Sequence, residues 1–396
     1  TTTSTSTTWE EQVTSTVEIN HATTNGPTLI KGDNFGASVV DIGDLNSDGV
    51  NDLAVGANSD DMDESGNATG GEHRGAVHIF YMNTDGSVDS TVEINDSTAN
   101  GPDLEDSDFF GDSVANIGDL NGDGVNDLAV GAYKDDAGGS ARGAVHIMFM
   151  NTDGSVDSTV EINDSTANGP TLRNGDWFGV SVANIGDLNG DGVNDLAVGA
   201  ELDDMDESGN ATGGSARGAV HIMFMNTDGS VDSTVEINDS TANGPTLTNS
   251  DKFGISVANI GDLDGDGVND LAVGAYEDAT GGANRGAVHI MFMNTDGSVD
   301  STVEINSSTA NGPTLANADK FGRSVANIGD LDGDGVNDLA VGATGDNMKA
   351  NGNEDGANRG AVHIIHMNTD GSVKSVVEIN DFTTNGPSIG DHDWFG

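Results

Sequence analysis

Short apolar segments alternate with turns rich in Gly, Asn and Asp along almost the whole chain. The segments contain many β-branched residues and are bounded by Gly, so the pattern predicts β-strands. One stretch shows four of them, at Val180–Ile185, Asp195–Ala200, Gly218–Met225 and Ser233–Asn238. The last two are joined by Asn226-Thr227-Asp228-Gly229, which is typical of a β-hairpin turn. The sequence therefore predicts an all-β fold of antiparallel strands.

The four-strand pattern recurs in five complete repeats, with partial repeats at both ends. A Phe-Gly pair marks the start of each repeat, at Phe35, Phe110, Phe178, Phe253 and Phe321, and a partial sixth repeat begins at Phe395. Four antiparallel strands in a repeat of about 70 residues are typical of a β-propeller blade. Because one blade leaves both faces of its sheet uncovered, neighbouring blades must bury them. We expect a propeller array over residues 13–396, preceded by a Thr/Ser-rich linker over residues 1–12.

A nine-residue loop joins the first and second predicted strands of each repeat. In the third repeat it runs from Asp187 to Asp195, with side-chain oxygens at loop positions 1, 3, 5 and 9. Gly192 permits a sharp bend, and the carbonyl of Val193 can add a backbone ligand. Hard oxygen ligands at this density suit Ca2+. Position 12 is Val198 instead of the Glu of an EF-hand, so we expect the cation to clamp a β-hairpin turn.

All five copies of this loop keep Asp at positions 1, 5 and 9, whereas position 3 is Asn or Asp. An ordinary Asn/Asp/Gly turn is the alternative for a single loop, but five repetitions of one ligand pattern favour metal binding. We therefore predict about one Ca2+ per repeat, five in the chain. The predicted ligands are Asp44, Asn46, Asp48, Val50, Asp52, Asp119, Asn121, Asp123, Val125, Asp127, Asp187, Asn189, Asp191, Val193, Asp195, Asp262, Asp264, Asp266, Val268, Asp270, Asp330, Asp332, Asp334, Val336 and Asp338.

The Phe-Gly pair, the Asp-rich loop and the Gly-Ala pairs together resemble FG-GAP repeats. In the third repeat these motifs are Phe178-Gly179, the loop Asp187–Asp195, and Gly199-Ala200 followed by Gly218-Ala219-Val220. FG-GAP repeats form the propeller of integrin alpha subunits and of many microbial surface proteins. The resemblance covers nearly the whole chain and implies a seven-bladed propeller with Ca2+ in the hairpin between strands one and two. The Pro of the GAP signature is replaced in every repeat, by Asn58, Tyr133, Glu201, Tyr276 and Thr344.

Composition limits the environment and the partners. The net charge is −54 and the chain has no Cys. An acidic, well-hydrated surface suits a salty environment and opposes binding to nucleic acid. No apolar run is long enough to span a membrane, and the lack of Cys excludes a disulfide framework without excluding an extracellular location. We expect an extracellular or cell-surface protein.

Two further residue types recur at fixed positions of the repeat. One His stands in each Gly-Ala-Val-His-Ile segment, and we expect it to pack between blades, with a metal-binding ring as the alternative. One Arg precedes each of these segments, and we expect it to pair with a blade carboxylate. The His residues are His78, His146, His221, His289 and His363, and the Arg residues are Arg74, Arg142, Arg217, Arg285 and Arg359.

The segments between the second and third strands carry acidic runs at Asp60–Glu64 and Asp203–Glu207. A solvated acidic loop is the expected interpretation, with a second cation site as the alternative. Asn-x-Ser/Thr sequons predict candidate glycosylation sites on exposed turns. They lie at Asn67, Asn95, Asn163, Asn210, Asn238 and Asn306.

The two ends carry matching partial repeats. Val13–Asn20 resembles the fourth strands of the repeats but has no first three strands before it, and Phe395-Gly396 resembles the start of a repeat. An isolated strand would leave backbone groups unpaired. We expect Val13–Asn20 to complete a sheet of a neighbouring copy or of a longer chain by β-augmentation. Pairing with the third strand of the fifth repeat, in place of Val376–Asn380, is the alternative.

No motif of a catalytic nucleophile is present, so we expect a protein that is not an enzyme. The main functional hypothesis is a calcium-stabilised, extracellular structural or adhesive repeat protein of a microbial cell surface. Its partners would be other copies, surface proteins or glycans. Two alternatives are a subunit of an extracellular filament or sheath, and a carbohydrate-binding or accessory domain of a larger secreted enzyme.

Overall fold

The computed structural model describes residues 17–61, 71–204, 215–347, 358–384 and 386–396, which form twenty β-strands and no helix. They make five four-stranded antiparallel sheets, in agreement with the predicted blades. Blades 1 and 2 comprise β1 (Phe35–Gly43), β2 (Asp52–Ala57), β3 (Ala76–Met82), β4 (Val88–Ile94), and β5 (Phe110–Gly118), β6 (Asp127–Ala132), β7 (Ala144–Met150), β8 (Val156–Ile162). Blades 3 and 4 comprise β9 (Phe178–Gly186), β10 (Asp195–Ala200), β11 (Ala219–Met225), β12 (Val231–Ile237), and β13 (Phe253–Gly261), β14 (Asp270–Ala275), β15 (Ala287–Met293), β16 (Val299–Ile305). Blade 5 comprises β17 (Phe321–Gly329), β18 (Asp338–Ala343), β19 (Ala361–Met367) and β20 (Val373–Ile379).

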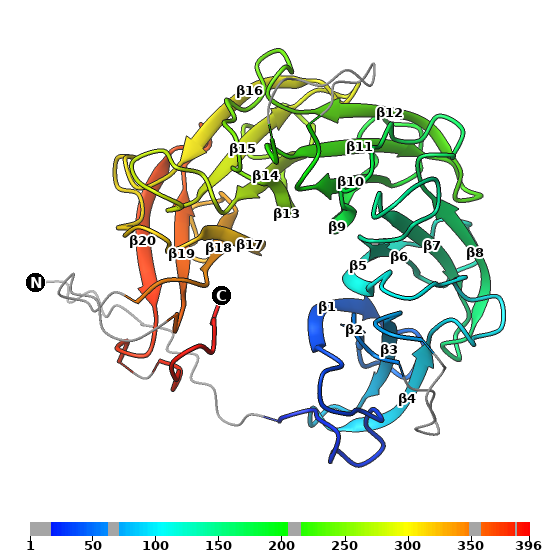
Figure 1. The fold of residues 1–396 in the computed structure, drawn as a ribbon. Helices are drawn as coiled ribbons and strands as arrows, with labels where there is room; N and C mark the ends of the chain where they lie inside the picture. Colours follow the sequence, from blue (N-terminus) through cyan, green and yellow to red (C-terminus); the bar gives the residue numbers. More distant parts are fainter. Residues whose placement is uncertain (1–16, 62–70, 205–214, 348–357, 385) are drawn as a thin grey trace, which may run out of the picture.

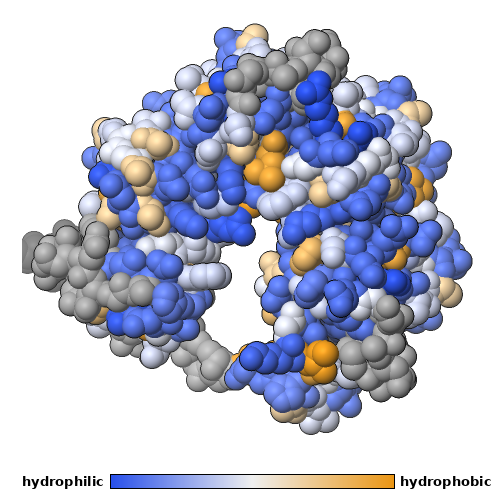
Figure 2. Space-filling view, in the orientation of Figure 1, coloured by the Kyte–Doolittle hydropathy of each residue, from blue (hydrophilic) through white to orange (hydrophobic). Residues whose placement is uncertain are grey.

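The blades follow one another in an arc around a central channel (Figure 1). The first strand of each blade lies nearest to the channel and the fourth lies at the outside. Figure 2 shows that the channel stays open when side chains are drawn. The described residues form five blades, so the count of seven implied by the resemblance is not met within them.

Neighbouring blades join through the Phe-Gly and Gly-Ala motifs. Phe253 is fully buried at the start of β13, and it forms a parallel bridge with Gly218 of the preceding blade. Gly199 of β10 lies so close to the next blade that a Cβ there would be 1.8 Å from the carbonyl oxygen of Gly254. The motifs are therefore the contact points between blades, because only Gly lets the two backbones approach this closely.

The core lies between the sheets. Ile147 and Phe149 of β7 pack in one buried cluster with Met223 and Met225 of β11, and equivalent clusters fill the other blade interfaces. This arrangement explains why the third strands are apolar at nearly every position, since both faces of the sheet are covered.

The segment at the N-terminal side lies against blade 1. Residues 17–20, the described part of the predicted strand Val13–Asn20, are not in a strand, although Ile19 packs against the cluster of Val55, Phe80 and Val88. The turn that follows resembles the turns after the fourth strands, because the carbonyl of Asn25 accepts a hydrogen bond from the Thr91 hydroxyl at 2.8 Å. Residues 13–16 and the linker lie outside the described residues.

At the other end, Phe395 forms a parallel bridge with Gly360, as the Phe residues that begin blades 2, 4 and 5 do with the Gly of the blade before them. β19 pairs with β20 of its own blade. Both edges of β19 are thus occupied by β18 and β20, and no described residue of the N-terminal segment pairs with it. Donation of the N-terminal segment to another sheet stays a prediction.

In the described part of the chain there is no helix that is both long and apolar enough to cross a membrane.

Candidate functional site

The predicted metal ligands lie in five equivalent hairpin turns, between the first and second strands of each blade. In the third turn, Oδ1 of Asp187 accepts hydrogen bonds from the N–H groups of Gly190 and Asp191, at 2.7 and 2.9 Å. Asn189 and Asp191 close two further small turns in the same way. These backbone bonds fold the loop so that its short polar side chains turn inward, which is the arrangement that an oxygen cage needs.

The ninth residue of the loop anchors the turn to the sheet. Asp195 is fully buried; its Oδ2 accepts the N–H of Leu188 at 2.9 Å and its Oδ1 accepts the N–H of Met225 at 3.0 Å. Burial raises the pKa of Asp195 to about 6, and the nearby charge of Asp191 adds to the shift. A cation beside this carboxylate would reverse the shift, because it would favour the charged form.

Carboxylate oxygens converge most closely in the fourth and fifth turns. One oxygen each of Asp262, Asp264 and Asp270 lies within 4.8 Å of the others, and the same is true of Asp330, Asp332 and Asp338. Three anionic oxygens at this separation repel one another without a counter-ion. The donor set is made only of hard oxygens, so the residues fit Ca2+.

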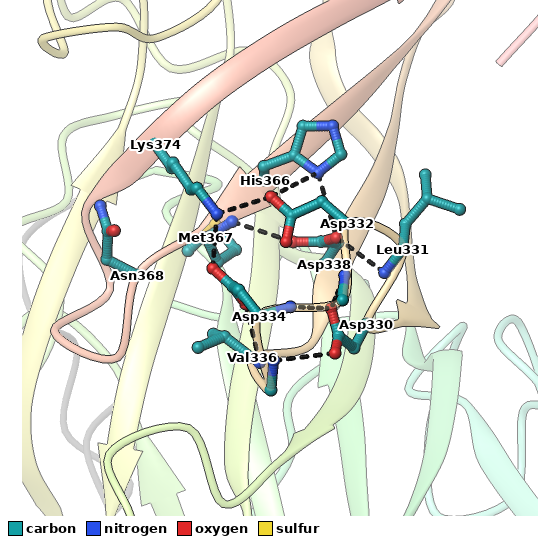
Figure 3. A network of polar contacts seen from close by, with 12 residues as sticks. Asp330, Leu331, Asp332, Asp334, Val336, Asp338, His366, Met367, Asn368 and Lys374 are labelled. Atoms are coloured by element: carbon teal, nitrogen blue, oxygen red, sulfur yellow. Dashed lines mark hydrogen bonds and ion pairs between the residues drawn. The ribbon is translucent and has the colours of Figure 1, made fainter. Parts of the chain in front are cut away.

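The fifth turn has an internal cation that the sequence analysis did not anticipate. Lys374 of β20 reaches Oδ2 of Asp332 at 2.7 Å and Oδ2 of Asp334 at 2.6 Å (Figure 3). Nδ1 of His366 lies 3.1 Å from Oδ2 of Asp338. The Lys374 ammonium lowers the pKa of Asp334 by hydrogen bonding to it. In the other four repeats the position of Lys374 is Asp, namely Asp89, Asp157, Asp232 and Asp300.

We expect Lys374→Asp to raise the affinity of the fifth turn for Ca2+ by about tenfold, because the ammonium competes for two of the ligands. Calorimetric titration of the metal-free protein should resolve one weaker site that becomes like the other four in the variant. Lys31→Asp, which makes the same charge change at an exposed site, serves as the control. Identical isotherms for the wild type and Lys374→Asp would contradict this role of Lys374.

A second feature is a cluster of aromatic and cationic side chains, which we call the rim cluster. It consists of Phe109, Tyr133, Lys134, Trp177, Lys252, Tyr276, Lys320 and Arg323. Phe109, Trp177, Lys252 and Lys320 directly precede first strands, Tyr133, Lys134 and Tyr276 follow second strands, and Arg323 is the third residue of β17. These positions lie on the side of the blades opposite to the hairpin turns that join first and second strands. The ammonium of Lys134 lies 4.4 Å from the ring centroid of Phe109 and 5.2 Å from that of Trp177. These distances are those of cation–π contacts.

The other half of the rim cluster surrounds Tyr276. Its hydroxyl accepts a hydrogen bond from Nζ of Lys252 at 2.8 Å, and the guanidinium of Arg323 lies 5.0 Å from its ring centroid. A cavity of about 310 Å³ opens beside Tyr276, Lys320, Arg323 and Trp394.

The charge of Arg323 acts on buried carboxyl groups of other blades. Burial raises the pKa of Asp112 in blade 2, and Arg323 in blade 5 partly offsets this increase. Arg323 acts in the same direction on the pKa of Glu201 in blade 3. Side chains from opposite parts of the arc therefore share one electrostatic environment.

A signal for the rim cluster was present in the sequence. The segment Val-Asn-Asp-Leu-Ala-Val-Gly-Ala is the same in all five repeats, yet the residue after it is Asn58, Tyr133, Glu201, Tyr276 or Thr344. The residue before each Phe-Gly pair varies as widely. Positions that differ among otherwise near-identical repeats are those that the shared blade fold does not dictate. In the resemblance to FG-GAP repeats, the first set of positions stands out only as a loss of Pro.

Two other expectations have clear outcomes. The Arg residues pair with carboxylates in four blades, as predicted: Arg74 with Asp96, Arg142 with Asp164, Arg217 with Asp239 and Arg359 with Asp381. In blade 4 the acidic partner is replaced by Ser307, which accepts from Arg285 at 3.3 Å.

The expectation of exposed sequons is wrong for Asn95, Asn238 and Asn306, which are buried. Their side-chain amides donate to the Glu two residues earlier and their Oδ1 atoms accept backbone N–H groups, so a local turn already uses each amide. Asn163 makes the same bonds and is half-buried. Asn67 and Asn210 lie outside the described residues.

Comparison with known proteins agrees with this architecture. The family model of the FG-GAP repeat matches residues 110–148, 178–223, 253–291 and 321–365. Integrin alpha-PS5 of Drosophila melanogaster is 34% identical over 171 residues, which cover 43% of this chain and 15% of that protein. Integrin alpha-5 of Xenopus laevis is 33% identical over 256 residues, which cover 61% of this chain and 20% of that protein. The chain thus spans a fifth or less of the length of these relatives.

Among solved structures, hydrazine synthase of Kuenenia stuttgartiensis is similar with a TM-score of 0.42 and 12% identity, covering 94% of this chain and 71% of that one. A rhamnogalacturonan lyase of Bacillus licheniformis has a TM-score of 0.33 and 16% identity, covering 83% of this chain and 61% of that one. At this level of similarity neither structure bears on what the chain does.

Proposed function

Because the chain is a β-propeller built from FG-GAP repeats, related to the propeller region of integrin alpha subunits, we propose that it is a calcium-stabilised, extracellular adhesive protein without catalytic activity. In this proposal the five metal turns hold the blades rigid, and the rim cluster binds the ligand. A cell-surface location is supported by the relation to integrin alpha chains and by an acidic surface that suits salty surroundings. A microbial source remains part of the proposal.

The observation that carries the adhesive role is the composition of the rim cluster. Only 13 residues of the chain are Lys or Arg, and five of them are the Arg residues that support the blades. Of the remaining eight, Lys134, Lys252, Lys320 and Arg323 gather at the rim cluster. They stand beside half-buried aromatic rings, including Phe109 and Trp177. Trp, Tyr and Arg are enriched among the residues that contribute most to binding at protein interfaces.

The aromatic and cationic side chains of the rim cluster fit an acidic polysaccharide better than a neutral one. Flat aromatic faces can cover the apolar face of a sugar ring, while Lys and Arg pair with its carboxylates. The net charge of −54 does not prevent such binding, because at physiological ionic strength charges beyond about 8 Å are largely screened. The cations nearest to the ligand therefore dominate the interaction.

Binding to alginate, an acidic polysaccharide, tests the proposal. We expect Lys134→Ala and Trp177→Ala each to weaken binding by about tenfold or more, because each removes part of the aromatic and cationic contact. Lys31→Ala removes an exposed charge elsewhere and should bind like the wild type, and neutral dextran should bind poorly. The proposal fails if the wild-type protein ignores alginate, or if it binds an acidic peptide instead.

The second candidate function is that of a filament subunit, and the exposed sheet faces of blades 1 and 5, at the two ends of the arc, favour it. Val39 on β1 is 59% exposed and Val377 on β20 is 51% exposed, whereas equivalent residues between blades are buried or half-buried. An exposed apolar sheet face is a surface that another blade can cover. A second copy of this chain offers such a blade.

A further inference from the structure

The cavity of about 310 Å³ in the rim cluster opens beside Tyr276 of blade 4 and the first strand of blade 5. Tyr276 and Trp394 supply aromatic rings to its lining, and Lys320 and Arg323 supply positive charge. Tyr276 is buried, whereas Trp394 is 59% exposed. No Asp or Glu is among the described residues that line the cavity, although 67 residues of the chain are acidic. The cavity is therefore a positively charged site on a strongly acidic protein.

The two cations that line the cavity have no carboxylate partner. Among the described residues, neither Lys320 nor Arg323 forms an ion pair or a side-chain hydrogen bond; their cationic groups lie over the ring of Tyr276, 5.6 and 5.0 Å from its centroid. Lys252, the third cation beside that ring, differs because its Nζ lies 3.7 Å from Oε1 of Glu277. Cation–π contacts leave the N–H groups of Lys and Arg able to donate hydrogen bonds. An anionic ligand can therefore bind here without breaking an internal ion pair.

The residue before each Phe-Gly pair has a backbone conformation that bulky residues rarely adopt. Its φ lies between 52° and 61° in all five repeats and at Trp394. The first repeat has Asn34, a residue type that tolerates this conformation, whereas the later positions are Phe109, Trp177, Lys252, Lys320 and Trp394. Gly would adopt the same φ without a steric cost. Large side chains at so unfavourable a position indicate that the side chains have a use, and two of them line the cavity.

The size and lining of the cavity fit a single anionic sugar residue. Its volume lies at the lower end of the range of about 300–1,000 Å³ that is typical of small-ligand pockets. The exposed ring of Trp394 can cover the apolar face of a sugar ring, and the guanidinium of Arg323 can donate two hydrogen bonds to a carboxylate or a sulfate group. Thr344 and Asn358 also line the cavity and offer a hydroxyl and an amide to sugar hydroxyls.

We propose that this cavity is a subsite for one anionic sugar residue. The carboxylate or sulfate group of the sugar pairs with Lys320 and Arg323, and its ring lies against Trp394. This subsite rests on the function proposed above, in which the rim cluster binds an acidic polysaccharide. It adds that the charge on one sugar residue is recognised at the cavity, with Arg323 as the residue that distinguishes an acidic sugar from a neutral one.

Binding of single sugars to the full chain, followed by ligand-observed NMR titration, tests the subsite. The probes are glucuronate, glucose 6-sulfate and glucose. We expect at least one of the two anionic sugars to bind tenfold or more tightly than glucose, because glucose offers a similar ring without the charge. The tighter of the two shows whether the cavity prefers a carboxylate or a sulfate ester. The proposal is overturned if neither binds more tightly than glucose.

Arg323→Gln should weaken binding of the anionic sugar by about tenfold. Arg323→Lys keeps the charge but loses the paired donors, so it should weaken binding less. Trp394→Ala should also weaken binding, because it removes the ring that covers the sugar. Arg323 and Trp394 are exposed, so these variants should keep the melting temperature of the wild type. Lys31→Gln removes an exposed charge elsewhere and is the control. Equal affinity of Arg323→Gln and the wild type for the anionic sugar contradicts the subsite.

Alginate separates the subsite from the function on which it rests. If alginate binds the wild type and Arg323→Gln equally and no single acidic sugar binds, the subsite is wrong while polysaccharide binding stands. If glucuronate binds in a manner that depends on Arg323 but alginate does not bind, the subsite stands and the polysaccharide function is wrong. A Glu-rich peptide that requires Arg323 for binding, when neither anionic sugar binds, would assign the cavity to a peptide and overturn the proposal.

Discussion

Removal of Ca2+ by excess chelator is expected to lower the melting temperature of the protein by on the order of 10–20 °C. A site stabilises a fold by about 2.7 kcal/mol when free metal is at 100 times the Kd, and five turns act together. Without metal, the carboxylates of each turn repel one another, as the convergence of Asp262, Asp264 and Asp270 indicates. Differential scanning calorimetry with and without chelator measures the shift.

Adding back Ca2+ should restore the original melting temperature, whereas the same concentration of Na+ should not. Asp191→Ala is expected to reduce this recovery more than Asn189→Ala, since it removes a charged ligand instead of a neutral one. A melting curve that excess chelator leaves unchanged would show that the turns do not bind a stabilising metal.

Gly199→Ala is expected to destabilise the interface between blades 3 and 4 by about 3 kcal/mol or more. The added Cβ would lie 1.8 Å from the carbonyl oxygen of Gly254, and that neighbour is backbone, which cannot turn away as a side chain can. Because blades are stabilised by their neighbours, the effect should spread along the array. Urea unfolding followed by circular dichroism measures the change.

The matched control is Ser233→Ala, which also introduces Ala in blade 3 but at an exposed, uncharged position of β12. It should unfold at nearly the same urea concentration as the wild type. If Gly199→Ala is as stable as this control, close contact between the Gly-Ala and Phe-Gly motifs is not what holds the blades together.

Local pattern was enough to predict the blades. The strands of repeat three were placed within two residues of β9, β10, β11 and β12, because apolar segments and Gly-rich turns are properties of neighbouring residues. β9 begins at Phe178, before the predicted Val180, since an irregular register lets Phe178 pair with Ala200 beyond a bulge. The hairpin turn at Asn226 formed as predicted, with Gly229 donating to the carbonyl of Asn226 at 3.0 Å.

The Asp-rich hairpin turns were also predictable, since each loop is nine consecutive residues and the same spacing recurs five times. The Lys side chain that enters the turn of blade 5 could not be predicted in this way. Lys374 lies 40 residues after Asp334 in sequence, and only the pairing of β18, β19 and β20 brings its ammonium to the loop.

By itself, the sequence determined what is local and repeated: the strands, the five blades, the oxygen-rich turns and the contacts of the Arg residues. Tertiary structure alone decided what is assembled from separate blades. It brought Lys134 to the rings of Phe109 and Trp177, and Lys374 to the hairpin turn of blade 5. It also buried the amide of Asn95, which a sequence motif cannot reveal. The physical reason is that burial and electrostatic contact depend on which segments the curvature of the array brings together, and no periodicity within one repeat encodes that curvature.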